Sequence, residues 1–342
     1  MNRILVINVN WLGDVVFSTP VFKALKRAYP KATISCLAPS RVEGALECCP
    51  FIDEVITFDE KGKDESFFAK LSLIYRLRAK KFDAAFLLHR SLTRALIVFL
   101  AGIPVRVGYD TKGRGFLLTH RAKALPEGTH RRDHYLGVVE SFGVEVHDRT
   151  CELAADEKSL KTIEALLRKN SITPSDFLVV VNAGGNWDLK RWPKENFSLL
   201  IARLAQMGNV EIVLPGSGKD RALAEEIAVK SRFRPVILCG ETNLKELIAL
   251  MKRANLVIAA DTGPLHVASA MGTPTIGLFG PTRPEVTGPR GKGKTVTLQN
   301  DVGCNRLPCY YLECPNNVCM KTITVEEIVA VVREVVVKNL KF

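Results

Sequence analysis

Short apolar segments alternate with longer amphipathic segments along this chain, and this alternation constrains the fold more than any other feature. In the first half, runs with the length and composition of buried strands occupy 3–9, 32–38, 55–58, 82–88 and 105–109. Helix-length segments separate them. Strands that are joined through helices form a parallel sheet with right-handed crossovers. The pattern therefore predicts an α/β fold.

The same pattern starts again after about residue 155, and 342 residues are enough for two such domains. Further strands are expected at 177–182, 210–214, 236–238, 256–260 and 275–279, and further helices at 193–206, 220–231, 244–254 and 264–270. Asn243 and Glu246 are spaced as a capping box, and so are Thr324 and Glu327. We therefore divide the chain into a first domain, a helix and linker, a second domain and a C-terminal helix that is free to pack back on the first domain. Their bounds are 1–155, 156–176, 177–323 and 324–342.

The first helix is expected over 15–28, but Pro20 lies inside it. Proline has no backbone N–H and disturbs the interior of a helix. We therefore expect either a kink at Pro20 or a late helix start with Thr19 as its cap.

Positive charge is concentrated in one part of the chain. Between residues 76 and 132 there are 13 Lys and Arg residues against three acidic residues, a net charge of +10. Such an excess indicates an anionic partner, such as a phosphorylated substrate, a nucleic acid or an anionic membrane surface, although a solvated basic face is an alternative. The chain has no recognisable nucleic-acid-binding module and few aromatic residues among its basic ones, so we do not expect it to bind nucleic acid.

No apolar run reaches the roughly 18 residues of a membrane-spanning helix. The apolar run at 4–9 is too short for the core of a signal peptide. We therefore expect a cytoplasmic protein.

Three loops of the second half follow predicted strands and carry glycine or polar residues typical of phosphate sites. They contain Ala183, Gly184, Gly185, Asn186 and Lys190; Gly216 and Ser217; and Asp261, Thr262, Gly263 and His266. Glycines allow close approach of a ligand, amides at a helix start bind phosphate, and an ammonium group can neutralise a diphosphate. Together these loops predict a nucleotide-diphosphate site. Neither a Walker A motif nor a G-x-G-x-x-G motif is present, which argues against ATP hydrolysis and against NAD or FAD.

Asp14 is the candidate catalytic residue of the first half. It follows Gly13 after the first strand, where a carboxylate can accept the proton of an attacking hydroxyl. The alternative is structural, because Asp is favoured at helix starts. His266 is a second candidate base, or a hydrogen-bonded part of the wall. The histidines at 89, 120, 130 and 134 have no metal-ligand spacing, and we expect no metal site there.

These motifs resemble those of glycosyltransferase family 9, the bacterial heptosyltransferases. The resemblance is carried by Asn10-Trp-Leu-Gly-Asp14 with Ser18-Thr-Pro20, by Lys190-Arg-Trp-Pro193, and by Asp261-Thr-Gly-Pro-Leu-His266 with Gly272-Thr-Pro274 and Gly280-Pro-Thr282. The motifs look most similar to those of the type II lipopolysaccharide enzymes.

The resemblance implies the GT-B fold, with two Rossmann-like domains whose parallel sheets face each other across a cleft. It also implies inverting, metal-independent transfer from an ADP-heptose donor to a lipid A–Kdo–heptose acceptor at the inner face of the cytoplasmic membrane, with no cofactor. By position in the motifs, Asp14 is the base and Lys190 stabilises the diphosphate. Asp261, Thr262, Gly263 and His266 fall in the donor-binding motif. A binding protein of the same fold, or a transferase with another donor, remains an alternative.

An anionic acceptor would explain the basic segment. Guanidinium groups bind carboxylates and phosphates in a bidentate manner. The candidate acceptor-binding residues are therefore Arg90, Arg94, Arg106 and Arg114.

Four evenly spaced cysteines stand near the C-terminus, at Cys304, Cys309, Cys314 and Cys319. Their five-residue steps lack the close pairs of common zinc sites. A structural metal, a disulfide pair and free thiols all remain open, and reduced thiols fit a cytoplasmic protein best.

Overall fold

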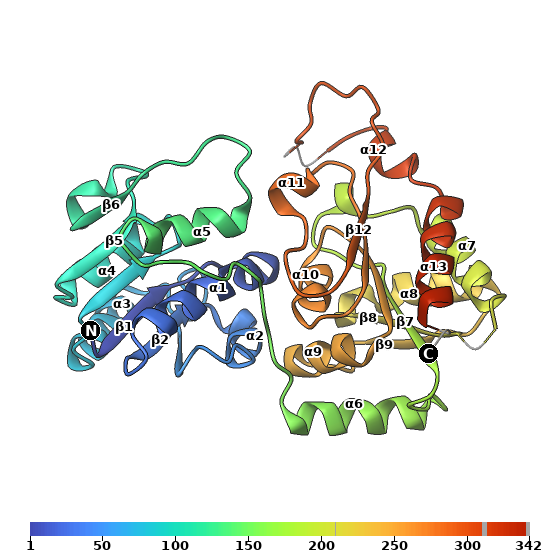
Figure 1. Cartoon of the computed structure of the whole chain (residues 1–342), viewed down its shortest axis with the longest axis horizontal. Helices are drawn as coiled ribbons and strands as arrows, with labels where there is room; N and C mark the ends of the chain where they lie inside the picture. The colour runs from blue at the N-terminus through green and yellow to red at the C-terminus, as the bar shows by residue number, and fades with distance from the viewer. Residues whose placement is uncertain (209, 310–312, 340–342) are drawn as a thin grey trace. The chain divides into compact units, whose positions relative to one another are not determined.

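The computed structural model describes residues 1–208, 210–309 and 313–339, with side chains described up to residue 335. The chain forms two compact units, Met1–Ala154 and Ala155–Phe342, and each is considered by itself (Figure 1). Among the described residues, no helix combines the length and the apolarity needed to cross a bilayer.

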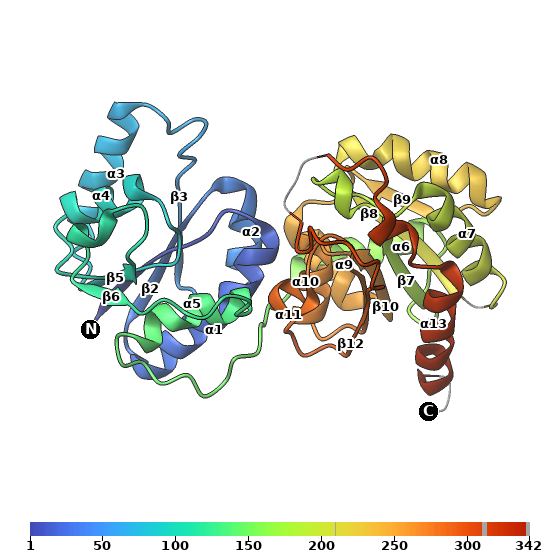
Figure 2. The same ribbon diagram turned by 90° about the horizontal axis from the view of Figure 1, so that it is seen from above.

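The first unit is a six-stranded parallel sheet with the order β3-β2-β1-β4-β5-β6. Its strands are β1 (Arg3–Ile7), β2 (Thr33–Ala38), β3 (Glu54–Thr57), β4 (Ala84–Leu87), β5 (Val105–Tyr109) and β6 (His120–Ala122). Its helices are α1 (Leu12–Ala28), α2 (Glu43–Glu47), α3 (Phe67–Ala79), α4 (Leu92–Leu100) and α5 (Arg131–Glu140). The helices α3 and α4 pack on one face of the sheet, while α1 packs against α5 (Figure 2).

The second unit repeats this topology, with the order β12-β11-β10-β7-β8-β9. Its strands are β7 (Phe177–Asn182), β8 (Val210–Gly216), β9 (Val236–Cys239), β10 (Leu256–Ala260), β11 (Thr275–Leu278) and β12 (Thr295–Leu298). Its helices are α6 (Glu157–Lys169), α7 (Lys194–Ala205), α8 (Arg221–Ser231), α9 (Leu244–Arg253), α10 (Gly263–Ala270), α11 (Pro284–Thr287), α12 (Val318–Lys321) and α13 (Val325–Asn339).

In both units the direction of winding reverses once. In the first unit the reversal lies between β1 and β4, and in the second between β7 and β10. Open α/β sheets bind their ligands in the crevice at the carboxyl ends of the strands on either side of such a reversal. The fold thus marks one edge in each unit as its ligand-binding edge.

The helix α1 differs from expectation, because it begins at Leu12 and continues through Pro20. The prediction of a late start capped by Thr19 is wrong. Pro20 cannot donate to the carbonyl of Val16, but the Thr19 hydroxyl donates to that carbonyl at 2.8 Å. The lost backbone hydrogen bond is thereby replaced, and Asp14 lies in the first turn of the helix.

The final helix α13 also differs from expectation. Its buried side chains Val325, Ile328, Val329 and Val332 belong to the core of the second unit, and α13 packs against α7 (Figure 1). The suggested packing of this helix on the first domain is therefore wrong for these side chains. Both predicted capping boxes are confirmed, at Asn243 with Glu246 and at Thr324 with Glu327.

Candidate active site

The three loops predicted to bind a nucleotide meet at the carboxyl edge of the second sheet. A Cβ atom on Gly184 would lie 2.6 Å from the Asp220 carboxylate, and one on Gly185 would lie 3.3 Å from the Thr262 methyl group. Asn182 donates from its side-chain amide to the Gly184 carbonyl at 3.1 Å. The backbone of the loop after β7 therefore packs closely against side chains of the loops after β8 and β10, and at Gly184 a Cβ atom would overlap the Asp220 carboxylate.

Lys190 and Asp261 connect the first and third of these loops. The Lys190 ammonium lies 2.6 Å from Asp261 Oδ2, and it also donates to the Asp261 backbone carbonyl at 3.2 Å. An ammonium group has three N–H donors. Two of the three are directed at Asp261, which leaves one for a ligand at this edge.

Asp261 is buried, with 5% of its surface exposed, and several donors converge on its carboxylate. His266 Nε2 lies 3.1 Å from Oδ1, while the hydroxyl groups of Thr282 and Thr287 donate to Oδ2 at 2.7 and 3.1 Å. Burial alone would raise the pKa of Asp261, but His266 and Lys190 outweigh it and hold that pKa well below its usual range. The carboxylate is therefore ionised and fixes the positions of these side chains.

The remaining predicted donor residues lie on the same edge with different exposure. Ala183 is buried, whereas Asn186 and Ser217 are exposed. Gly216 ends β8, and Ser217 forms a capping box with Asp220. Thr262 is the N-cap of α10, and Gly263 is its first residue.

In the first unit, Asp14 lies beside the reversal between β1 and β4. The Tyr135 hydroxyl donates to Asp14 Oδ1 at 2.7 Å. Burial, together with the neighbouring Asp14 carboxylate, raises the pKa of Tyr135 well above its ordinary value, so Tyr135 remains a protonated donor. This bond occupies one carboxylate oxygen of Asp14. Gly13 precedes Asp14 in the first turn of α1 and is partly exposed.

A cavity of about 260 Å³ opens next to this pair. Its lining residues come from the ends of β4 and β5, from the loop after β5 and from the start of α5: Leu88, His89, Arg90, Tyr109, Lys112, Arg131, His134 and Tyr135. Three of these carry a permanent positive charge and none is acidic. The cavity is suited to an anionic group.

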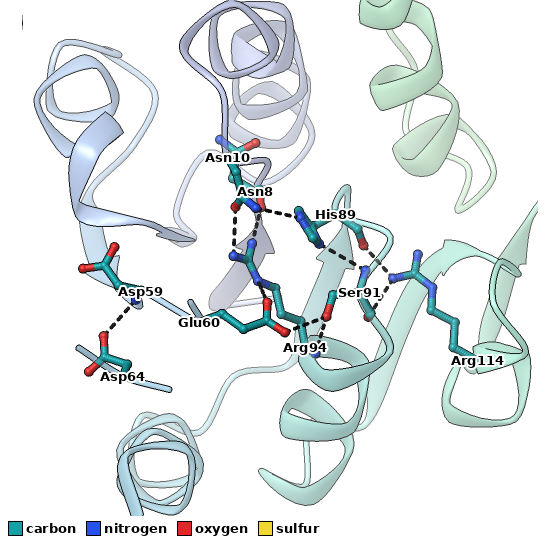
Figure 3. A network of polar contacts seen from close by, with 9 residues as sticks. All are labelled: Asn8, Asn10, Asp59, Glu60, Asp64, His89, Ser91, Arg94 and Arg114. Carbon is teal, nitrogen blue, oxygen red and sulfur yellow. Dashed lines mark hydrogen bonds and ion pairs between the residues drawn. The ribbon is translucent and has the colours of Figure 1, made fainter. Parts of the chain in front are cut away.

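His89, one of the residues that line this cavity, belongs to a polar network (Figure 3). The Ser91 N–H faces His89 Nδ1 at 3.1 Å, and the Asn10 side-chain amide nitrogen faces Nε2 at 3.0 Å. Arg94 donates to Asn10 Oδ1, which turns that amide nitrogen towards the ring. Burial, followed by the charge of Arg94, lowers the pKa of His89 to about 4. The ring is therefore neutral at pH 7.

Of the four arginines predicted to hold the acceptor, Arg90 alone is exposed and lines the cavity. Arg94 is buried and bonds to Glu60 and to the Asn8 carbonyl at 3.0 and 2.8 Å. Arg114 is buried and donates to the carbonyls of Tyr109 and His89.

Arg106 donates to the carbonyls of Leu117 and Ile103. Through these bonds to backbone carbonyls and to the partly exposed Glu60 carboxylate, the three guanidinium groups hold loops together. Acceptor binding by Arg94, Arg106 and Arg114 stays a prediction that their contacts do not support.

Sequence reasoning missed several residues that the structure brings to these edges. They are Tyr135, Lys112 and Arg131 in the first unit, and Asn182, Asp220 and Thr287 in the second. Tyr135 lies 121 positions from Asp14 and has no motif around it, so no local signal could have found it. Thr282 is part of the Gly280-Pro-Thr282 motif, but the sequence does not show that its hydroxyl group donates to Asp261.

The four C-terminal cysteines are unbridged. Cys304 and Cys314 are exposed, while Cys309 and Cys319 are partly buried. Within 1–208, 210–309 and 313–339, no group of three or more His, Cys, Asp or Glu side chains is arranged to hold a metal ion.

Two doubly wound parallel units define the GT-B class of fold, and solved structures agree. The glycosyl transferase family 9 structure from Veillonella parvula matches with a TM-score of 0.88 at 24% identity, covering 98% of this chain and 97% of that one. The E. coli ADP-heptose lps heptosyltransferase II matches with a TM-score of 0.81 at 24% identity, covering 98% and 99%. The expected α/β class and GT-B fold are confirmed.

The chain belongs to glycosyltransferase family 9 (heptosyltransferase), whose family model matches residues 70–317. Lipopolysaccharide heptosyltransferase 2 of Salmonella typhimurium is 29% identical over 303 residues, which cover 84% of this chain and 85% of the relative. Lipopolysaccharide heptosyltransferase 3 of Escherichia coli is 32% identical over 283 residues, which cover 79% and 80%. The resemblance read from the three motifs is confirmed, and the protein is a glycosyltransferase.

Proposed function

We propose that this enzyme transfers a heptose from ADP-heptose to the heptose of the lipopolysaccharide inner core, as a type II enzyme. Relatives with the names lipopolysaccharide heptosyltransferase 2 and 3 support the sugar and the acceptor. An E. coli family member solved with ADP supports the nucleotide. The observation that carries the proposal is the carboxylate of Asp14, held by Tyr135 beside a cationic cavity.

The donor diphosphate binds at the edge of the second unit. The glycines at 184 and 185 keep the loop after β7 close to Asp220 and Thr262, at the edge where the phosphates bind. The amides at the start of α10, after Thr262, and the uncommitted N–H of Lys190 stabilise the negative charge that grows on the departing ADP. These groups supply positive potential without a metal ion, so we expect transfer to continue in the presence of EDTA.

The transfer is a single displacement with inversion at the anomeric carbon. The acceptor hydroxyl oxygen forms a bond to that carbon while the bond from the carbon to the ADP oxygen breaks. The hydroxyl proton passes to Asp14 Oδ2, because Tyr135 occupies Oδ1.

The acceptor occupies the cationic cavity of the first unit. Arg90, Lys112 and Arg131 are placed to bind the carboxylates or phosphates of an inner-core sugar chain. His134 also lines this cavity. The basic segment seen in the sequence thus contributes to the acceptor site through Arg90, which was expected, and through Lys112 and Arg131, which were not.

The test is the Asp14→Asn variant, assayed with a set of nucleotide-sugars. Loss of a general base lowers turnover by about 10²- to 10⁴-fold. We expect that loss in kcat, with ADP affinity unchanged and with ADP-heptose preferred over UDP- and GDP-sugars. Glu145→Gln, which changes an exposed carboxylate of the same unit, is the matched control and keeps full activity.

Two results would contradict the proposal. Retained turnover in Asp14→Asn would show that Asp14 is not the general base. Stronger binding of another nucleotide-sugar would show that the donor is not ADP-heptose. A protein that binds ADP-heptose but never transfers the sugar would be a binding protein of this fold.

A further inference from the structure

The helix α4 is apolar on its solvent side as well as on its core side. Leu92, Leu96, Phe99 and Leu100 are 43%, 43%, 44% and 41% exposed. Residues at spacings of three and four share one face of a helix, so these four side chains form a continuous strip. A surface helix of a water-soluble domain normally places polar residues there.

The elements packed against α4 also expose apolar side chains. The helix α3 packs beside α4 and exposes Phe67, Phe68 and Tyr75, of which Phe68 is 79% exposed (Figure 2). The 3₁₀ helix Arg114–Leu117 also packs against α4 and exposes Phe116. We call the exposed residues of these three elements the apolar face; they are Phe67, Phe68, Tyr75, Leu92, Leu96, Phe99, Leu100 and Phe116. Exposed aromatic and leucine side chains gathered in this way mark an interaction surface.

Positive charge surrounds the apolar face. The Arg78 guanidinium donates to the Leu100 carbonyl at 2.7 Å, and that of Arg106 lies 5.2 Å from the centre of the Phe99 ring. Between residues 66 and 106 there are seven lysines and arginines besides the buried Arg94, and one acidic residue, Asp83; the exposed Glu65 precedes this range. A protein partner for so one-sided a charge would have to be strongly acidic, whereas an anionic lipid surface offers both negative charge and an apolar interior.

We propose that the apolar face of α3 and α4 docks the enzyme on an anionic lipid bilayer. The phenyl rings and leucines enter the boundary between headgroups and acyl chains, as the apolar side of an interfacial helix does. The surrounding lysines and arginines remain at the level of the lipid phosphates. Neither the insertion of apolar side chains nor the attraction of the basic ones to the phosphates is sufficient alone for membrane binding. Together they give reversible binding that weakens at high salt.

The position of the face relates docking to catalysis. The helix α4 begins at Leu92, directly after Ser91 and Arg90, and Arg90 lines the cationic cavity. A bilayer on the apolar face would therefore lie near the mouth of the cavity. This use of the face rests on the proposed lipid-linked acceptor, whereas docking itself does not require sugar transfer.

The experiment is co-sedimentation of the full-length protein with vesicles. One set is pure phosphatidylcholine, and the other contains phosphatidylcholine and phosphatidylglycerol at about three to one. We expect binding to the anionic vesicles at least about tenfold tighter than to neutral ones at low salt. The double variant Leu96→Ser/Phe99→Ser should bind the anionic vesicles at least about tenfold more weakly.

The matched control is Leu199→Ser/Val229→Ser, which removes two exposed apolar side chains from α7 and α8 of the second unit. It should bind vesicles as the unchanged protein does. Thermal unfolding is measured first, and only variants as stable as the unchanged protein are compared. Both double variants should retain transfer to a water-soluble, deacylated acceptor. That assay separates a failure of docking from a failure of the proposed transferase activity.

Three results would overturn the proposal. These are equal binding of neutral and anionic vesicles, unchanged vesicle binding by Leu96→Ser/Phe99→Ser, and a concentration-dependent dimer in sedimentation velocity that this variant abolishes. The last would show that the face pairs with a second copy of the chain.

Discussion

Two carboxylates near strand ends, Asp14 and Asp261, have very different surroundings. Asp261 is buried and bound by a lysine, a histidine and two threonine hydroxyls. Asp14 is partly exposed and accepts one bond, from Tyr135. A carboxylate saturated with donors organises its neighbours, whereas one with a free oxygen can take a proton. This contrast favours Asp14 as the base.

The Tyr135→Phe variant tests this contrast. The Tyr135 hydroxyl holds Asp14 Oδ1 at 2.7 Å, so its loss should leave the carboxylate less well positioned for the acceptor hydroxyl. We expect kcat to fall about tenfold with KM nearly unchanged, since a bond to a charged group contributes roughly 1.5 kcal/mol. Tyr29→Phe, at the other end of α1, should leave kcat unchanged. An unchanged kcat in Tyr135→Phe, or a change in KM alone, would show that Tyr135 does not act through Asp14.

The residues of the site could be predicted from the sequence better than the hydrogen bonds that they form. Glycines after strands, Lys190 and Asp261 were identified from local spacing, and the structure brings them together. Arg94, Arg106 and Arg114 were identified as cationic, but the sequence does not show that their N–H groups are used by backbone carbonyls. Those partners come from distant segments, which no local pattern encodes.

At the scale of elements, α1 shows how a single side chain can preserve a helix. Pro20 removes one backbone donor, and the hydroxyl group of Thr19 replaces it at Val16. The expected late start at Thr19 was wrong because helix propensity accounts for the missing N–H of Pro20 but not for the hydroxyl group that replaces it. The edge strands β6 and β12 were not predicted either. They are short, and β6 consists of His120, Arg121 and Ala122, which lack an apolar run.

The capping box of α9 yields a prediction at this scale. The Asn243 side chain accepts from the Glu246 N–H at 3.0 Å, and the Glu246 carboxylate accepts from the Asn243 N–H at 2.8 Å. Asn243→Ala should lower the free energy of unfolding of the second unit by about 1 kcal/mol, measured by urea denaturation. Gln206→Ala, at the exposed end of α7, should change it by less than about 0.5 kcal/mol. Equal stability of the two variants would show that the cap contributes nothing.

At the scale of the whole molecule, the two units share one topology and carry different chemistry. The first has a cationic cavity and a carboxylate, and the second has glycine loops around an ion pair. The position of each edge could be inferred from the strand order, since both lie at the reversal of winding. What each edge binds depends on loop residues, which vary independently of the fold.

Assignment of the nucleotide to the second unit predicts a local response to ADP. Hydrogen exchange should slow in residues 183–193 and 261–266, and ADP at about 100 times its Kd should stabilise that unit by roughly 2.7 kcal/mol. Lys190→Gln should weaken ADP binding about tenfold, while Lys194→Gln, which removes an exposed lysine paired with Glu226, should not. Protection confined to the first unit would contradict the assignment.

The ion pair between Lys190 and Asp261 has a consequence for turnover. In the proposed reaction, the departing diphosphate shares the Lys190 ammonium with the buried Asp261 carboxylate. This sharing limits how tightly Lys190 can hold ADP, and after ADP dissociates the Asp261 carboxylate still neutralises the ammonium. We therefore expect Asp261 to favour product release.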